Sequence, residues 1–304
     1  MPCFDLGGPL LLVIVALTGA IAAPLGVSGM RGEFFVSDIS VPTQHWVLLW
    51  AVILCAQGAI WMLSVAWLLR APFWLETKLA GATITRPGAR AWILEVVLPA
   101  SLLACALVAT ERLPPPGSFP LQTVGGHPVP GLSAAAAVGF IVSVLFSGGL
   151  LFASATLRAT FDGTGNWAPK LGTFVVLQGF MNRCLYGASM ILGLGTVATA
   201  AIRGANNFPR EYVIIYGATF TLALGLAYLA ARRAFETVGN RILEEASGAP
   251  RPLDADWSAA DWQEKREVLS SVMQLGFSGL GSFGPGVSTL VPLLLSIISA
   301  LFPD

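Results

Sequence analysis

Charged side chains are scarce in this chain of 304 residues: 11% are Asp, Glu, Lys or Arg, against about a quarter in a soluble domain. So few charges cannot cover a globule with a water-facing surface. Hydrophobic residues make up 55% of the sequence, and the mean hydropathy is +0.73. We therefore expect an all-α, polytopic integral membrane protein, a helix bundle with the lipid bilayer as its surroundings.

The residues that build catalytic and metal sites are also few. The four cysteines lie far apart, which is neither a disulfide framework nor a metal-binding spacing. His45 and His127 have no pattern of carboxylates or cysteines around them. Basic residues in 232–267 alternate with acidic ones, unlike a nucleic-acid-binding surface. We expect no catalytic residues, metal, cofactor or nucleic-acid partner, and we predict that the protein is not an enzyme.

Six apolar stretches are long enough to cross a bilayer as helices, which needs about 20 residues. They are residues 8–27, 45–69, 91–110, 132–157, 184–202 and 213–231. Residues 20–22 resemble a signal-peptidase site, but residues 1–7 contain no Lys or Arg. A retained first helix is therefore favoured over a cleaved signal peptide, and both remain open.

The stretch 171–202 is too long for a simple span and carries Gln178, Asn182 and Arg183 near its centre. One interpretation is a single tilted helix with an intramembrane arginine. The other places residues 172–182 along the cytoplasmic interface, so that only 184–202 crosses. We favour the second interpretation, because it leaves Arg183 at the boundary, where long cationic side chains reach water easily.

A long helix is predicted over residues 209–246. Pro209 and Glu211 are typical of a helix start, and no further proline follows before residue 250. A helix of this length would extend well beyond a bilayer core of about 30 Å. We therefore divide the chain into a transmembrane bundle (1–231), a cytosolic helical extension (232–275) and an apolar, Gly-rich C-terminal segment (276–304).

Within the extension, residues 248–256 form a predicted linker, and a second helix is predicted over 258–275. Its residues Trp262, Val268, Leu269, Val272 and Met273 fall roughly on one side. In the C-terminal segment, 287–302 would be only about 24 Å long as a helix. It is a seventh apolar stretch that is re-entrant, interfacial or packed against other helices.

The distribution of positive charge predicts the orientation. With six spans, residues 70–90, 158–170 and 232–267 lie on the same side and carry most of the 17 Lys and Arg residues. Loops rich in Lys and Arg stay in the cytoplasm. We expect a multi-pass protein of the cell membrane, inner or plasma, with the N-terminus and 232–267 in the cytoplasm.

Polar residues inside apolar stretches are the first candidates for a functional site. Glu95 is the only acidic residue in the proposed spans and lies near the cytoplasmic end of its span. Arg183 lies on the same side of the membrane in the predicted topology. The two form a functional pair, or else both lie at the level of the lipid headgroups. Gln178, Asn182 and Gln57 are the other intramembrane polar candidates.

Small residues recur every four positions in the long helix, at Gly217, Thr221 and Gly225 and, on a second line, at Ala223 and Ala227. Such lines let helices approach closely in lipid, either within one chain or between subunits. Further along, Phe235, Val238 and Ile242 continue an apolar stripe. Burial of this stripe requires the tail helix that carries Trp262, or another subunit.

Three classes of function remain. The first is an oligomeric channel, pore or transport protein whose cytosolic helices couple to gating or to partners. The alternative is a membrane-anchored signalling or scaffold subunit of a larger complex, without transport. An intramembrane enzyme ranks last, because it needs convergent carboxylates, histidines or Ser–Lys pairs. In the first two classes we expect a homo-oligomer or a partner protein bound through the cytosolic helices.

Overall fold

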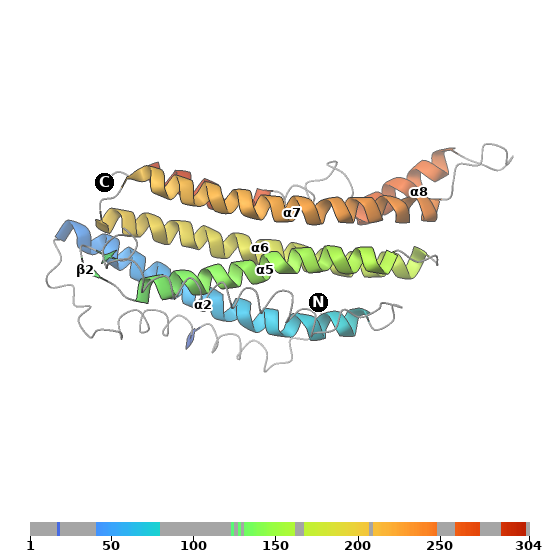
Figure 1. Ribbon diagram of the computed structural model, residues 1–304. Helices are drawn as coiled ribbons and strands as arrows, with labels where there is room; N and C mark the ends of the chain where they lie inside the picture. Colours follow the sequence, from blue (N-terminus) through green and yellow to red (C-terminus); the bar gives the residue numbers. More distant parts are fainter. Residues whose placement is uncertain are drawn as a thin grey trace.

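The computed structural model describes residues 17–18, 41–79, 123–124, 127–128, 131–161, 167–206, 209–247, 259–273 and 287–301. Their helices are α2 (Val41–Leu79), α5 (Gly131–Phe161), α6 (Trp167–Asn206), α7 (Arg210–Ser247), α8 (Ala259–Val272) and α10 (Val291–Leu301). Two short strands, β1 (Thr123–Val124) and β2 (His127–Pro128), pair antiparallel. Apart from this pair, the described elements are α-helical, as the composition predicts (Figure 1).

Four long helices, α2, α5, α6 and α7, lie side by side, and α6 contacts the other three as well as α10 (Figure 1). Each is long and apolar enough to cross a membrane: His45–Ala71, Ile141–Phe161, Trp167–Gly204 and Arg210–Ala246. These are the only such helices in the described ranges. Six crossings stay a prediction, because 91–110 and all of 8–27 except residues 17–18 lie outside the described residues.

Helix α6 corrects our interpretation of residues 171–202. It runs unbroken from Trp167 to Asn206, so the division at Arg183 is wrong. The physical reason is an apolar stripe that passes through the polar cluster without interruption. Its members are all buried at helical spacing: Phe174, Leu177, Met181, Cys184, Leu185 and Ala188. A bend at Arg183 would split this stripe between two directions.

Helix α2 extends beyond the apolar stretch 45–69 that the sequence defines. The helix continues through Pro72 to Leu79. A proline inside a helix removes one backbone hydrogen bond, at a cost of roughly 3 kcal/mol. Beyond Pro72, Leu75 is buried and Trp74 is half-buried against the bundle. Packing of this last part of α2 therefore offsets the cost of the proline.

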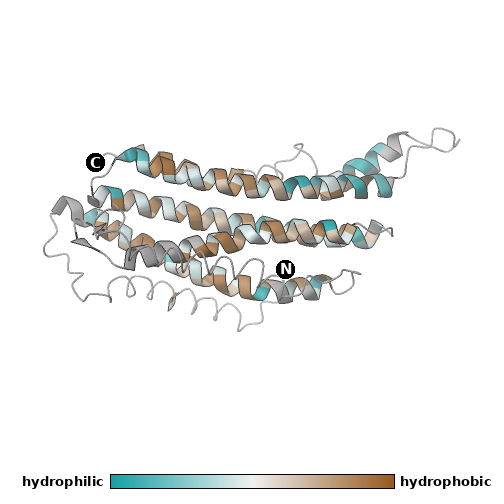
Figure 2. Cartoon of the chain, viewed as in Figure 1, coloured by the Kyte–Doolittle hydropathy of each residue, from teal (hydrophilic) through white to brown (hydrophobic). Residues whose placement is uncertain are grey.

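Helix α7 confirms the long helix that the sequence predicts. It spans Arg210–Ser247, 38 residues, and is about 57 Å long at about 1.5 Å per residue. Its first half is hydrophobic and its second half carries most of its charged residues (Figure 2). Both halves belong to the same straight rod, so the rod joins two regions of different polarity.

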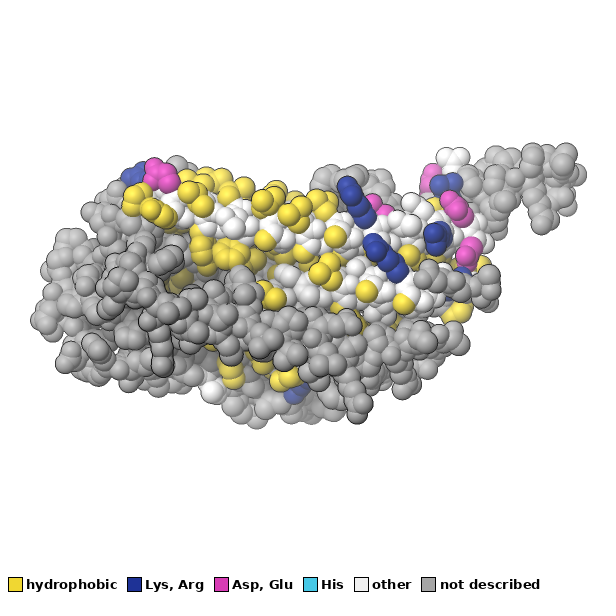
Figure 3. Space-filling view, viewed as in Figure 1, with side chains coloured by type: hydrophobic (Ala, Val, Ile, Leu, Met, Phe, Trp, Pro, Cys, Tyr) yellow, Lys and Arg dark blue, Asp and Glu magenta, His cyan; other side chains and the backbone are white. Residues whose placement is uncertain are grey.

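Charged residues are absent from the middle of these helices. None occurs between Arg183 and Arg203 in α6, or between Glu211 and Arg232 in α7. Each interval is about 30 Å long, which matches the hydrocarbon core of a bilayer. Figure 3 shows the same arrangement on the surface: hydrophobic side chains cover the middle of the α7 face, and charged ones gather towards its two ends.

An aromatic stack joins three helices at one end of this charge-free region. The Trp67 ring of α2 lies between Phe146 of α5 and Phe180 of α6, with 5.6 Å between ring centroids on each side. The close approach of α5 to α6 depends on Gly187 of α6, because a Cβ at this position would lie 2.6 Å from the Phe146 ring. The three helices are thus fixed to one another by stacked rings, of which Phe146 and Phe180 are buried and Trp67 is half-buried.

Candidate functional site

The site that we describe is the seat of the C-terminal helices on the bundle, which we call the tail seat: the surfaces of α6 and α7 that hold α8 and α10. Helix α8 packs along α7, and α10 packs along both α7 and α6 (Figure 1). Successive contacts of α10 run in opposite order along α7, Leu293 with Thr221 and Ser296 with Gly217. The tail therefore returns antiparallel to the rod.

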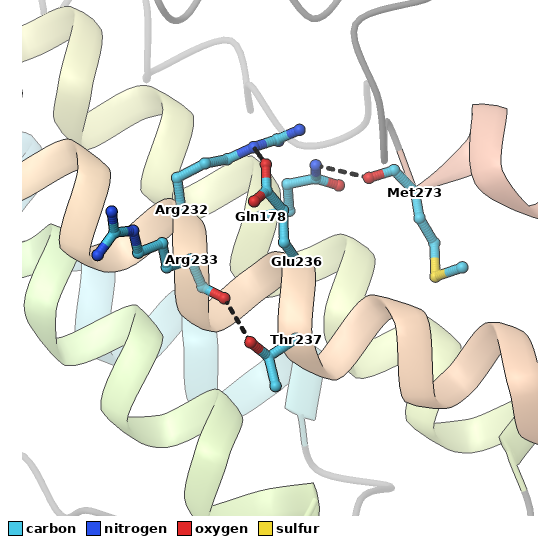
Figure 4. Close-up of polar contacts among 6 residues, drawn as sticks. All are labelled: Gln178, Arg232, Arg233, Glu236, Thr237 and Met273. Carbon is cyan, nitrogen blue, oxygen red and sulfur yellow. Dashed lines mark hydrogen bonds and ion pairs between the residues drawn. The ribbon is translucent and has the colours of Figure 1, made fainter.

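Helix α8 is held at its C-terminal end by Gln178 of α6. The side-chain amide of Gln178 donates a hydrogen bond of 2.8 Å to the backbone carbonyl of Met273, and both residues are buried (Figure 4). The last carbonyls of a helix have no partner within the helix. Gln178 supplies such a partner from another helix, so it acts as a cap for α8.

Helix α10 is held at its N-terminal end by Thr221 of α7. The backbone N–H of Leu293 donates to the Thr221 hydroxyl oxygen at 3.1 Å. Leu293 lies in the first turn of α10, where N–H groups also lack partners within the helix. An unpaired N–H in a water-poor region costs several kcal/mol. The two tail helices thus each have one terminal backbone group satisfied by a side chain of the bundle.

Small residues bring α10 close to the bundle. A Cβ at Gly217 would meet the Ser296 side chain and would lie 2.7 Å from the Pro292 carbonyl oxygen. A Cβ at Gly193 of α6 would lie 2.9 Å from Leu295. At Gly225, in contrast, a Cβ would meet nothing within 4 Å. The glycines that contact α10 therefore have a packing role within the chain, which was one of the two interpretations of the Gly217 line.

The apolar stripe of α7 is buried within the same chain. Phe235, Val238 and Ile242 are between 0% and 4% exposed, and the Phe235 ring meets Phe174 of α6 edge to face at 5.4 Å. On α8, Leu269 is half-buried against this core, and Met273 is fully buried. Of the other residues on the predicted side of α8, Val268 and Val272 are exposed; the side chain of Trp262 lies outside the described residues.

Ion pairs lie around this buried core. Arg232 pairs with Glu236 one turn along α7, with Nε and Oε1 2.8 Å apart (Figure 4). Lys170 of α6 pairs with Glu245 of α7 at 3.2 Å, and its ammonium lies 5.8 Å from the centre of the Phe161 ring. In both pairs the carboxylate is exposed to solvent, and such pairs contribute about 0–1 kcal/mol each. They indicate that this part of the bundle has a polar exterior around an apolar centre.

The other candidates from the sequence lie apart from the tail seat. Arg183 is exposed, with its guanidinium 5.1 Å from the centre of the Trp74 ring. Gln57 is buried in α2, and Asn182 is half-buried. Ala223 is exposed and Ala227 half-buried. Glu95 lies outside the described residues, so its predicted pairing with Arg183 stays a prediction.

Two features of the structure, one in the tail seat and one in the bundle, were not identified from the sequence. The partner of Gln178 is a backbone carbonyl 95 residues away, and backbone groups leave no signal in a sequence. The aromatic stack had a visible signal, because Trp67, Phe146 and Phe180 are large rings in apolar stretches. The contact between these rings depends on how three helices are placed relative to one another, and this placement cannot be predicted from the spacing of residues in the sequence.

By its described part, the chain is an α-helical protein with four helices able to cross a membrane. Comparison with protein families, with curated protein sequences and with solved structures finds no match.

Replacement of Gln178 by Leu is expected to loosen α8. The change leaves the Met273 carbonyl buried without its donor, which costs about 1–3 kcal/mol. Hydrogen exchange in the last turn of α8 should rise roughly tenfold or more, while exchange in α5 stays unchanged. Ser189→Ala is the matched control, because Ser189 is also buried in α6 but donates to Leu185 of its own helix. Equal exchange in both variants would show that Gln178 does not hold α8.

Proposed function

We propose that the protein is a membrane-anchored scaffold, in which the charge-free part of the bundle lies in the bilayer and the remainder projects into the cytoplasm and presents α8 to a soluble protein partner. One observation supports this proposal above the others. The packed core continues past the charged boundary at Arg183 and Arg232, through Phe174, Phe235 and Ile242. A structure built only to span a bilayer has no need of this extension.

The projecting part is substantial. From Arg232 to Ser247, α7 extends for about 22 Å beyond the charge-free region. Its apolar stripe faces α6, and its charged residues face outward, as in a water-soluble bundle. The predominance of Lys and Arg in residues 70–90, 158–170 and 232–267 supports a cytoplasmic location for this part.

Helix α8 is the element best suited to bind a partner. Its exposed side includes Val268 and Val272, one turn apart, together with the exposed carboxylates of Glu264 and Glu267. An apolar pair beside charged residues suits a protein surface with a small hydrophobic contact and a polar rim. Because Gln178 fixes one end of α8, these side chains are held in a defined position rather than on a free tail.

The same geometry favours a scaffold over a channel. A conductive path needs polar side chains or carbonyls that face a cavity. The buried side of α6 is instead mostly apolar. Its buried hydroxyls at Ser189, Thr196 and Thr199 donate to carbonyls of their own helix, and the amide of Gln178 is already bonded to Met273. Gly217 and Thr221, which are suited to line a subunit contact, are covered by α10 of the same chain.

Photo-cross-linking in intact cells tests the proposal. A photoreactive amino acid in place of Val268 or Val272 is expected to give a discrete adduct with one soluble protein. The same group in place of Leu226, which is exposed in the charge-free part of α7, should give no protein adduct, because it faces lipid. An adduct only with a second copy of the chain would contradict the soluble partner, and no adduct at either valine would refute the scaffold.

Flux measurements distinguish the competing class. The purified full chain, reconstituted in liposomes, is expected to show no ion or small-solute flux above protein-free vesicles. The Gln178→Leu variant should likewise show no flux, because release of α8 would open no path along the mostly apolar buried side of α6. Flux in either preparation would favour the channel or transport class over the scaffold.

A further inference from the structure

Two exposed arginines lie at the boundary between the charge-free and the charged parts of the bundle, on neighbouring helices. Arg70 is close to the end of the apolar part of α2, and Arg183 marks the same level on α6. Both side chains are exposed. In the part of the chain that the structure describes, neither forms an ion pair, whereas Arg232 and Lys170 each bind a carboxylate.

Both arginines lie next to Trp74. The Arg183 guanidinium lies over the Trp74 ring at 5.1 Å, and Arg70 precedes Trp74 by one helical turn on the same side of α2. Side chains one turn apart are neighbours on a helix surface, with about 5–6 Å between their Cβ atoms. Arg70 and Trp74 are therefore neighbours on the surface of α2, and Arg183 contacts the same tryptophan from α6. Lys78, exposed one turn beyond Trp74, adds a third positive charge to this row.

We propose that Arg70, Trp74 and Arg183 form a binding site for the headgroup of an anionic phospholipid. Guanidinium groups bind phosphate oxygens through two parallel hydrogen bonds, and a stacked guanidinium is already oriented for this contact. Indole rings favour the membrane interface, and basic pockets between transmembrane helices on the cytoplasmic side bind anionic headgroups. The phosphate would neutralise two like charges that no carboxylate of the described chain compensates.

The site rests on the proposed function in one respect, the position of the membrane boundary at Arg70 and Arg183. It is independent of the soluble partner of α8, because α8 packs against α7 whereas these arginines lie on α2 and α6. Absence of a cross-link from both Val268 and Val272 would therefore refute the scaffold and leave lipid binding intact.

Lipid retention by the purified full chain tests the site. The protein is exchanged into nanodiscs of phosphatidylcholine with a minor fraction of phosphatidylglycerol, and the phosphatidylglycerol that remains bound after release into detergent is counted by native mass spectrometry. Wild type is expected to retain it, and Arg70→Gln/Arg183→Gln should retain about tenfold less. Arg183→Lys should show intermediate retention, because lysine keeps the positive charge but lacks the planar guanidinium group.

Arg233→Gln is the matched control, since Arg233 is an exposed arginine at the same level of α7 that has no stacked tryptophan and no described ion pair. It should leave retention unchanged. Equal loss in Arg233→Gln and in the double variant would refute a specific site in favour of general attraction to a negative surface. A second experiment uses inorganic phosphate and measures the thermal stability of the wild type in neutral detergent. If millimolar phosphate alone stabilises the protein to the same extent as phosphatidylglycerol, the ligand is a soluble phosphate rather than a lipid.

Discussion

Gly217→Leu is expected to displace α10 from the rod, whereas Gly225→Leu is expected to leave it in place. Both glycines lie on the same line of α7, in the same charge-free region. Only Gly217 is covered: a Cβ there would lie 2.7 Å from the Pro292 carbonyl oxygen, while a Cβ at Gly225 would meet nothing within 4 Å. A backbone oxygen cannot rotate away as a flexible side chain can, so the helix itself must move.

Displacement of α10 has a second cost. Once the helix moves, the Leu293 N–H loses the Thr221 hydroxyl at 3.1 Å. In surroundings with little water this group finds no replacement, and the penalty is several kcal/mol. The steric and hydrogen-bond effects therefore act together, and Gly217→Leu should weaken α10 more than Thr221→Val, which removes the hydroxyl and keeps the shape.

A buried reporter measures this displacement. Ser299 of α10 is buried, so a cysteine in its place, in a chain without its native cysteines, should react slowly with a maleimide. In Gly217→Leu the reaction is expected to be about tenfold faster or more, which corresponds to about 1.4 kcal/mol of local opening. The rate in Gly225→Leu should match the parent chain. Equal rates in the two leucine variants would contradict the close packing of α10 on Gly217.

The Gly217 line also shows what the sequence could and could not predict. Small residues at four-residue spacing permit a close approach of another helix, and α10 makes such an approach at Gly217 but not at Gly225. They do not say which helix approaches. Helix α10, with 11 residues, is too short to have been counted as a firm span, yet it covers Gly217 and Thr221. A subunit contact and an internal contact leave the same pattern in one sequence.

Helix α6 gives the opposite lesson. The polar residues at its centre suggested a break, and local polarity was the wrong signal. The better signal was the uninterrupted apolar spacing from Phe174 to Ala188, which predicts one helix with one buried side. Gln178 lies within that stripe because its partner is the end of α8. A polar residue on an otherwise apolar side thus marks a contact whose nature only the placement of distant helices reveals.

Trp67→Ala is expected to cause the largest loss of global stability. The Trp67 ring lies between Phe146 and Phe180, so its removal empties the junction of α2, α5 and α6. Loss of a large aromatic side chain from a packed core costs about 3–5 kcal/mol, and the half-buried Trp67 falls at the lower end of this range. The neighbouring helices cannot close the space freely, because Phe146 is already pressed against Gly187. The free energy of unfolding, measured by denaturant titration in micelles, should fall by about 3 kcal/mol.

Two further variants separate the stack from simple hydrophobic burial. Leu69→Ala, two residues along α2, truncates an exposed side chain in the apolar part of the same helix and should change the unfolding free energy by less than about 0.5 kcal/mol. Trp67→Phe keeps a ring between Phe146 and Phe180 and should lose less than half as much as Trp67→Ala, because the two ring contacts persist in part. If Trp67→Ala proved no more damaging than Leu69→Ala, the stack would not hold the three helices together. The junction would then depend on Gly187 and the apolar side of α6 alone.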